Sequence, residues 1–178
     1  AGPGGVTFDI ATANGTATGG VDFVAQNSTG QTIPQGSSTY TFTVLVNGDT
    51  LNELTEAFLV NVTNVTNAVL VDGQGVGTIT NDDPLPMLAI IDATVTEGNS
   101  GTTNAVFTVA LSAASGQTVT FNYATAGGTA TAPSDYASTS GSLAFTPGQT
   151  TQTIFVPVVG DTVNEADETF FVNLSGAV

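Results

Sequence analysis

The stretch that decides the fold runs from Val119-Thr120-Phe121-Asn122-Tyr123 through Gly128-Thr129-Ala130-Thr131 to Asp135-Tyr136. Val119, Phe121 and Tyr123 alternate with polar residues. This period of two is typical of a β-strand with one buried face. The following residues are rich in Gly, Thr, Ser and Pro, which favours a loop. The stretch therefore predicts a strand that leads into a loop carrying an acidic residue.

The same stretch occurs a second time in the chain. Val6-Thr7-Phe8, Gly15-Thr16-Ala17-Thr18 and Asp22-Phe23 match it in order. Further along, Gly48-Asp49-Thr50-Leu51-Asn52-Glu53 recurs as Gly160-Asp161-Thr162-Val163-Asn164-Glu165. Gly148 follows its counterpart Gly36 by 112 residues (148 − 36). A repeat of that length is a domain rather than one turn of a solenoid.

Alternating segments without a helical stripe fill the rest of each repeat. They include 40–46, 58–62, 154–158 and 170–174, separated by Gly, Asn, Asp and Ser. This pattern predicts an all-β fold of tandem antiparallel β-sandwiches with about seven strands per repeat. The expected strands are 88–96 (with a break near Asp92-Ala93), 104–111, 117–125, 142–145, 150–159 and 167–174, and the closing strand is 75–80 in the first repeat. Pro157 indicates an edge position for strand 150–159.

Two prolines mark the expected domain boundary. Pro84 and Pro86 disfavour any regular element across residues 84–87, so this segment is predicted to be a linker. The first repeat then covers residues 1–83 and the second covers 88–178. Both copies are expected to be incomplete, because the first lacks the two opening strands and the second lacks the closing strand.

The composition excludes most functional classes. Of 178 residues none is Lys, Arg, His or Cys, 15 are Asp or Glu, and the formal net charge is −15. Nucleic acids and anionic membrane surfaces lack their main attraction to such a chain. Ser-His and Cys-His nucleophile pairs, thiolate metal sites and disulfides are also excluded. We therefore predict no enzyme activity, no nucleic-acid partner and no membrane insertion for this segment.

Strand direction predicts where the acidic residues lie. In an antiparallel sandwich alternate connections share one end, and twelve of the 15 acidic residues fall in connections expected at the same end. These are Asp22, Asp49, Glu53, Glu56, Asp82, Asp83, Glu97, Asp135, Asp161, Glu165, Asp167 and Glu168. Asp9, Asp72 and Asp92 are expected elsewhere on the surface.

A crowd of carboxylates repels itself, and this chain has no Lys or Arg to relieve the repulsion. Ca²⁺ is the natural counter-ion, because it takes six to eight oxygen ligands from flexible, carboxylate-rich loops. Mg²⁺ fits less well because it retains water in a strict octahedron. The simpler alternative is a solvated acidic rim that keeps the protein soluble.

The ordered motifs resemble the Calx-beta domain. They are Val95-Thr96-Glu97-Gly98, Gly128-Thr129-Ala130-Thr131 before Asp135-Tyr136, the Gly160 to Glu165 motif leading to Asp167-Glu168-Thr169-Phe170, and Gly75 to Asp83 closing a unit. Calx-beta domains occur in the regulatory loop of sodium/calcium exchangers, in an integrin β cytoplasmic region and in bacterial surface arrays. In its low content of charged residues, 8%, and its abundance of Thr and Gly, the chain is most similar to the bacterial arrays.

The resemblance implies an immunoglobulin-like sandwich and a set of Ca²⁺ ligands. In the first repeat these are Asp22, Asp49, the Leu51 carbonyl, Glu53, Glu56, Asp82 and Asp83. In the second they are Glu97, Asp135, Asp161, the Val163 carbonyl, Glu165 and Glu168. Asn81 stands where some relatives carry a third Asp. Neither ligand set is expected to be complete within this chain.

The function expected on this basis is a Ca²⁺-binding, non-catalytic structural module of a secreted or cell-surface tandem-repeat protein or filament, of bacterial type. Ca²⁺ would stiffen the joints between repeats, and the partners would be neighbouring repeats in the same chain or in adjacent subunits of a fibre. One alternative is a Ca²⁺-dependent adhesin, and another is a cytosolic Ca²⁺ sensor. A glycosidase based on Glu165 and Glu168 is disfavoured, since no Trp, Arg or His is present to build a sugar cleft.

Overall fold

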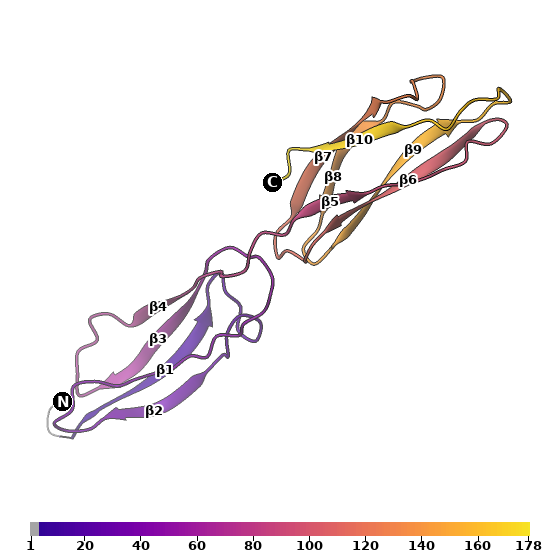
Figure 1. Ribbon diagram of the computed structural model, residues 1–178. Helices are drawn as coiled ribbons and strands as arrows, with labels where there is room; N and C mark the ends of the chain where they lie inside the picture. Colours follow the sequence, from indigo (N-terminus) through magenta and orange to yellow (C-terminus); the bar gives the residue numbers. More distant parts are fainter. Residues whose placement is uncertain (1–3) are drawn as a thin grey trace. The chain divides into compact units, whose positions relative to one another are not determined.

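The computed structural model describes residues 4–178, which form two compact units (Figure 1). The first consists of the residues up to Thr50 together with Leu54–Asp82, and the second of Leu51–Glu53 and Asp83–Val178. Strands and loops make up the whole of this range, without any helix, so it offers no helical segment that could span a bilayer. Each unit is described separately below.

The second unit is a sandwich of two antiparallel sheets. One sheet has the order β5-β6-β9, from β5 (Leu88–Ile91), β6 (Thr102–Leu111) and β9 (Thr151–Val159). The other has the order β10-β7-β8, from β10 (Phe170–Ser175), β7 (Val119–Gly127) and β8 (Ser140–Phe145). Pro157 lies in β9, which is an edge strand, as its missing N–H predicts.

Alternate residues of both sheets form the core of this sandwich. Phe121 and Phe145 come from one sheet and Val109, Ile154 and Val156 from the other, and each is at most 1% exposed. Their neighbours along the strands face outward, which confirms the period-two pattern read from the sequence. Burying each of these side chains contributes about 1.5–3 kcal/mol.

The first unit contains one four-stranded antiparallel sheet in the order β2-β1-β3-β4. Its strands are β1 (Val6–Asn14), β2 (Asn27–Ile33), β3 (Glu56–Thr66) and β4 (Gln74–Ile79). Ala17, Phe23 and Phe58 form its main buried cluster, with Val44, Val60 and Ile79 packed against it. The apolar face of the sheet is therefore covered by loops.

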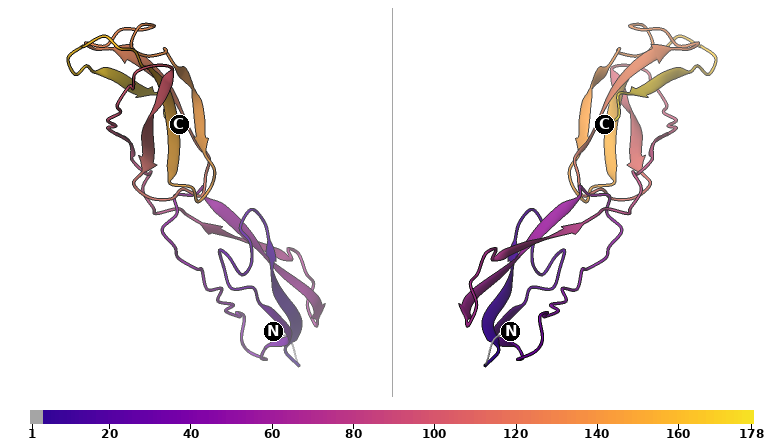
Figure 2. Two further views of the ribbon diagram at one scale, coloured as in Figure 1. Left: turned by 90° about the vertical axis from the view of Figure 1, so that its right-hand side faces the viewer. Right: turned by 90° about the vertical axis from the view of Figure 1, so that its left-hand side faces the viewer.

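The prediction of a strand at 40–46 was wrong. Residues 34–55 are drawn as a long loop between β2 and β3 in Figures 1 and 2, and within 40–46 the bridge that forms is an isolated one, from Val46 to Phe23. Tyr40 is 38% exposed and Val46 is 52% exposed. In the second unit the matching strand, β9, pairs with β6 along its length. Residues 4–82 include no counterpart of β6, so segment 40–46 has no strand to pair with along its length.

The strands for which bounds were predicted, β4 and β6 to β10, agree with the prediction to within three residues at their ends, and β5 does not. That strand stops at Ile91, at the break expected near Asp92-Ala93, and the rest of the predicted strand 88–96 is irregular. In the second unit the loops after β5, β7 and β9 gather at one end (Figure 1). This arrangement confirms, for that unit, the strand parity that placed the acidic residues together.

Candidate metal centre

The loop after β7 is shaped around the carboxylate of Asp135. Asp135 Oδ2 accepts hydrogen bonds from the Thr131 backbone N–H at 2.6 Å and from Thr131 Oγ1 at 3.2 Å. The Asp135 N–H in turn donates to the Thr131 carbonyl at 2.9 Å. A Thr four residues before an Asp thus closes a tight turn that holds the acid in place. The first unit repeats it, since Asp22 Oδ2 accepts from the Thr18 N–H at 2.6 Å.

An aromatic stack anchors this loop to the sheet. The Tyr136 ring lies on the Phe170 ring with centroids 4.6 Å apart, and Tyr136 is 3% exposed. The Ala130 N–H donates to the Thr169 carbonyl at 3.0 Å. Because Phe170 begins β10, these contacts join the loop after β7 to the segment that carries Glu165 and Glu168.

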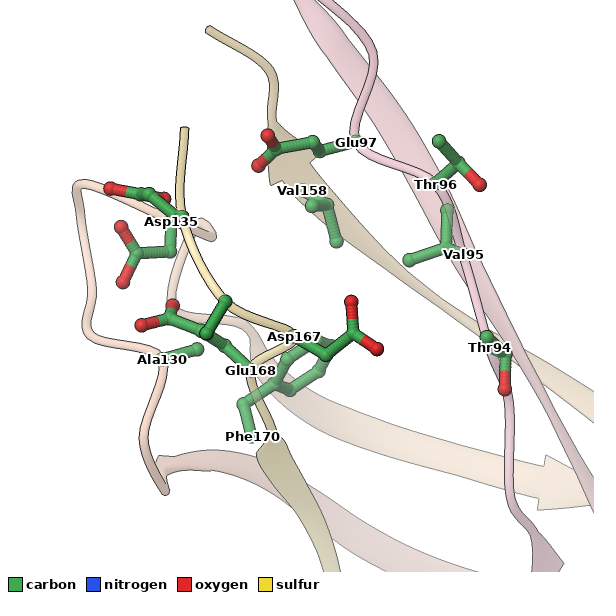
Figure 3. Close-up of a pocket in the computed structure, with 12 residues that line it drawn as sticks. Thr94, Val95, Thr96, Glu97, Ala130, Asp135, Val158, Asp167, Glu168 and Phe170 are labelled. Carbon is green, nitrogen blue, oxygen red and sulfur yellow. The ribbon is translucent and has the colours of Figure 1, made fainter. Parts of the chain in front are cut away.

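Three carboxylates of the second unit converge at this end. Asp135, Glu165 and Glu168 each offer an oxygen within 4.8 Å of the others, and we call them the second acidic group. They line a pocket of about 470 Å³ that also includes Glu97 and Asp167. Figure 3 shows the side chains of Glu97 and Glu168 directed toward the Asp135 side of the pocket, whereas Asp167 turns away. The group therefore draws on two loops, and Glu97 adds a third loop to the pocket lining.

The charges of this group oppose one another. Desolvation raises the pKa of Glu165, and the nearby charges of Asp161, Asp135 and Glu97 raise it further. Desolvation also raises the pKa of Glu168, followed by the charge of Asp135 and a carboxyl hydrogen bond with it. The pKa of Asp135 is lowered, mainly by the Thr131 N–H and then by Ser134. The structure thus keeps one carboxylate ionised by hydrogen bonds and crowds two more against it.

The first repeat holds a matching set. Asp22, Glu53 and Glu56 offer carboxylate oxygens within 4.8 Å of one another, and we call them the first acidic group. All three are partly buried. They occupy the same motif positions as Asp135, Glu165 and Glu168, so the repeated sequence places the same three acids together twice.

The remaining predicted Ca²⁺ ligands are not members of the two acidic groups. Glu97 and Asp161 act on Glu165 through their charges, and Asp161 Oδ1 accepts from the Val163 N–H at 2.6 Å. Val163 is 61% exposed. Asp49, Leu51, Asp82 and Asp83 lie outside the two groups of three. The Asp83 carbonyl accepts a hydrogen bond from Asn52 Nδ2 at 2.8 Å.

Sequence analysis missed the residues that hold the acids. Thr131 and Ser134 fix Asp135, and Thr18 fixes Asp22. The spacing of Thr and Asp in both repeats was the available signal. Asp9 was also assigned only to the surface, yet it accepts from the Gly30 N–H at 2.7 Å and from Asn64 Nδ2 at 2.6 Å. These bonds lower its pKa, the Asn64 amide most of all.

The donor set fits a hard divalent cation. Two oxygens that bind one Ca²⁺ at about 2.3–2.6 Å can lie at most about 5 Å apart, and the oxygens of each acidic group fall within that span. A bound cation would also relieve repulsion that no side chain of this chain can relieve.

The fold and the acidic loops define a class of protein, the tandem β-sandwich modules with a carboxylate-lined end. The chain belongs to the Calx-beta domain family, whose model matches residues 3–85 and again residues 86–177. The family resemblance read from the motifs is therefore confirmed.

Several curated relatives are sodium/calcium exchangers. The chain is 45% identical over 58 residues to sodium/calcium exchanger 1 of Canis lupus familiaris and of Bos taurus, which is 33% of this chain. It spans only 6% of the length of those curated relatives. Among solved structures, CBD12 from CALX1.2 matches with 24% identity and a TM-score of 0.44, over 97% of this chain and 68% of that one. The calcium binding domain CBD12 of CALX1.1 matches with 23% identity and a TM-score of 0.43, over 97% and 67%.

Proposed function

We propose that this chain is a Ca²⁺-binding, non-catalytic structural module. The observation that carries the proposal is the second acidic group, in which Asp135, Glu165 and Glu168 converge within 4.8 Å in a chain that has no cationic side chain. Oxygen-only, loop-borne carboxylates are the ligands that Ca²⁺ prefers.

Further oxygen ligands are proposed around each acidic group, because Ca²⁺ takes six to eight oxygen ligands and each group supplies three carboxylates. Glu97, Asp161 and the Val163 carbonyl complete the second site around its group of three. Asp49, the Leu51 carbonyl, Asp82 and Asp83 complete the first around Asp22, Glu53 and Glu56. Neither proposed site offers a His, Cys, Lys or Arg, since the sequence contains none. Acid–base chemistry would rest on carboxylates alone, which favours a binding role over a catalytic one.

The test is thermal unfolding of the full chain with Ca²⁺, Mg²⁺ or chelator. Ligand that binds only the folded state stabilises it by about 2.7 kcal/mol at a hundredfold excess over Kd. We expect Ca²⁺, and not Mg²⁺, to raise Tm. The variant D135N/E165Q/E168Q should lose the part of that rise that belongs to the second unit.

The matched control is D72N/D92N, which removes two acids outside both acidic groups. D72N/D92N should keep the full rise of Tm with Ca²⁺, although it makes the net charge less negative, as D135N/E165Q/E168Q does. A response to Ca²⁺ that Mg²⁺ reproduces, or that D135N/E165Q/E168Q retains, would contradict the proposal and leave a solvated acidic rim.

The exchanger relatives favour a second candidate, a Ca²⁺-responsive regulatory module. The two candidates differ in affinity. A structural module suits a Kd of about 10⁻⁴–10⁻³ M, as in extracellular modules, whereas a sensor requires about 10⁻⁷–10⁻⁵ M. Calorimetric titration of the full chain with Ca²⁺ measures this directly.

The wider setting is part of the proposal as well. We place the module in an extracellular or cell-surface repeat protein, on the basis of its low charged content of 8% and its abundance of Gly and Thr. Residues 1–83 and 88–178 would act as separate repeats joined by 84–87, with Ca²⁺ stiffening that joint. Small-angle scattering that is unchanged by Ca²⁺ under conditions where calorimetry shows binding would contradict the stiffening.

A further inference from the structure

The second compact unit includes a short segment from far upstream in the sequence, Leu51–Glu53. Asn52 at its centre is 7% exposed, and Ser115 beside it is 3% exposed. They are the buried polar residues of the described range. Because a buried polar group is costly unless it is hydrogen-bonded, such a pair marks a specific contact.

The contact is a set of hydrogen bonds to the turn Ser115-Gly116-Gln117. The Asn52 carbonyl accepts from the Gly116 N–H at 3.1 Å and from Ser115 Oγ at 3.3 Å. Asn52 Oδ1 accepts from Gln117 Nε2 at 3.4 Å. Asn52 Nδ2 donates to the Asp83 carbonyl at 2.8 Å. The backbone carbonyl and the side-chain amide of Asn52 are therefore both hydrogen-bonded in this contact.

The turn is also shaped to receive the residue after Asn52. A Cβ at Gly116 would lie 2.6 Å from Glu53 Cγ and 2.7 Å from Glu53 Oε1, so a larger residue there would displace the Glu53 side chain from this position. The turn itself is braced, because the Gln117 N–H donates to Ser115 Oγ at 3.0 Å and the Gly148 N–H donates to the Ser115 carbonyl at 2.9 Å. A rigid turn with a glycine gap and two side-chain donors is complementary to an Asn-Glu dipeptide.

The chain carries that dipeptide a second time. Asn164 and Glu165 stand in the same motif, after Gly160-Asp161-Thr162-Val163, and residues 161–169 are exposed. Asn164 thus presents to solvent the groups that Asn52 has buried.

We propose that the Ser115-Gly116-Gln117 turn is a docking site for the Asn-Glu dipeptide of a Calx-beta loop. Leu51–Glu53 fills it in this chain, and Asn164–Glu165 is the matching element for the Ser-Gly-Gln turn of a further Calx-beta repeat. The proposal stands on the contacts of Asn52 and on the repeated motif. It does not depend on Ca²⁺ binding, so either can fail without the other.

The test uses two copies of the full chain and heteronuclear NMR. A ¹⁵N-labelled N52G/E53G/N164A chain has an opened turn and no second Asn donor. It is mixed with unlabelled wild-type chain, or with unlabelled N164A chain as the matched control. High salt screens the repulsion between two chains of charge −15. We expect the wild-type chain, and not N164A, to shift the Gly116 amide and the Gln117 side-chain amide. Equal spectra with both partners up to about 1 mM would overturn the proposal.

A second measurement covers the case in which the labelled variant fails to fold. In the otherwise wild-type chain, N52G should speed hydrogen exchange of the Gly116 amide by about tenfold or more, because its acceptor is no longer held in place. N164G is the matched control and should leave that rate unchanged. The same Gly116 rate in N52G and in wild type would show that Asn52 is not docked, and the proposal would fall.

Discussion

The two units carry matching acidic loops on different frameworks. The loop between β7 and β8 belongs to a sandwich of two sheets, whereas the loop between β1 and β2 belongs to a unit with a single four-stranded sheet. Both loops nevertheless make the same contacts. Phe23 stacks on Phe58 with ring centroids 4.7 Å apart, as Tyr136 stacks on Phe170 at 4.6 Å. The shape of the acidic loop is therefore set locally.

The backbone contacts lead to the same conclusion. The Ala17 N–H donates to the Ala57 carbonyl at 2.9 Å, and the matching bond from Ala130 to Thr169 is 3.0 Å. The bonds from Asn47 to Asp22 and from Val159 to Asp135 are both 2.9 Å. Even the end of the unpaired segment 40–46 thus keeps its place beside the loop. The units differ in the sheet β5-β6-β9, which is present in the second unit and has no counterpart sheet in the described residues of the first. This sheet contributes side chains to the core and does not determine the geometry of the loop.

The largest expected effect separates the two cores. Phe121 is 1% exposed and packs near Phe145. Phe8 is its counterpart in the first unit, where the Phe8 and Tyr40 rings lie edge to face with centroids 5.1 Å apart. F121A should lower the free energy of unfolding of the second unit by about 3–5 kcal/mol. F8A should cost its own unit less, about 1–3 kcal/mol, because it faces a loop that can collapse.

Urea denaturation followed by unit-specific NMR amide signals measures both losses. Equal losses for F8A and F121A would show that the segment 40–46 packs as tightly as a sheet.

The next effect tests the contacts that the two units share. A Cβ on Gly15 would lie 2.3 Å from the Ala57 carbonyl oxygen, and one on Gly128 would lie 2.4 Å from that of Thr169. G15A and G128A should each destabilise their own unit by about 1–3 kcal/mol, by similar amounts. G148A, at an open position with a φ of +80°, is the control and should cost only about 1 kcal/mol. If G128A destabilised its unit and G15A did not, the two loops would not be equivalent.

Removal of single acids should resolve the two sites. At a tenfold excess of Ca²⁺ over Kd, binding stabilises by about 1.4 kcal/mol. D135N should abolish this gain in the second unit and preserve it in the first, and D22N should do the reverse. Unit-specific NMR signals during thermal unfolding report each gain. Loss of both gains in either variant would mean that the sites are not independent.

The smallest expected effect is a pH dependence in chelator. The raised pKa values of Glu165 and Glu168 mean that their protonated forms are favoured in the folded unit. The associated stability is fully present below the ordinary glutamate pKa and is lost as pH rises through the raised values. The lowered pKa of Asp135 acts oppositely, so its contribution is lost as pH falls below the ordinary aspartate range.

We therefore expect Tm of the second unit in chelator to rise as pH falls from 7 toward about 4.5 and to fall again in stronger acid. E165Q/E168Q should flatten the first part of this profile, as differential scanning fluorimetry can show. Ca²⁺ should reverse the first slope, since protons compete for the ligands.

The alternation of residues predicted which faces are buried, and strand parity predicted that the loops with Glu97, Asp135 and Glu165 meet at one end of the second unit. The segment 40–46 was misassigned because alternation reports burial of a face and not the presence of a neighbouring strand. The contact of Asn52 with Ser115 joins residues 63 positions apart. Local sequence specifies no partner at that separation, so the structure was needed to find it.

The aromatic stack of Tyr136 on Phe170 also has an optical consequence. The chain has no Trp and three Tyr, so its ultraviolet emission comes from Tyr40, Tyr123 and Tyr136. Tyr136 is buried next to Asp135, whereas the residue that follows Asp22 is Phe23, whose emission is far weaker. Each chain thus carries a built-in fluorophore beside one acidic group and almost none beside the other, and intrinsic fluorescence can follow the second group without any label.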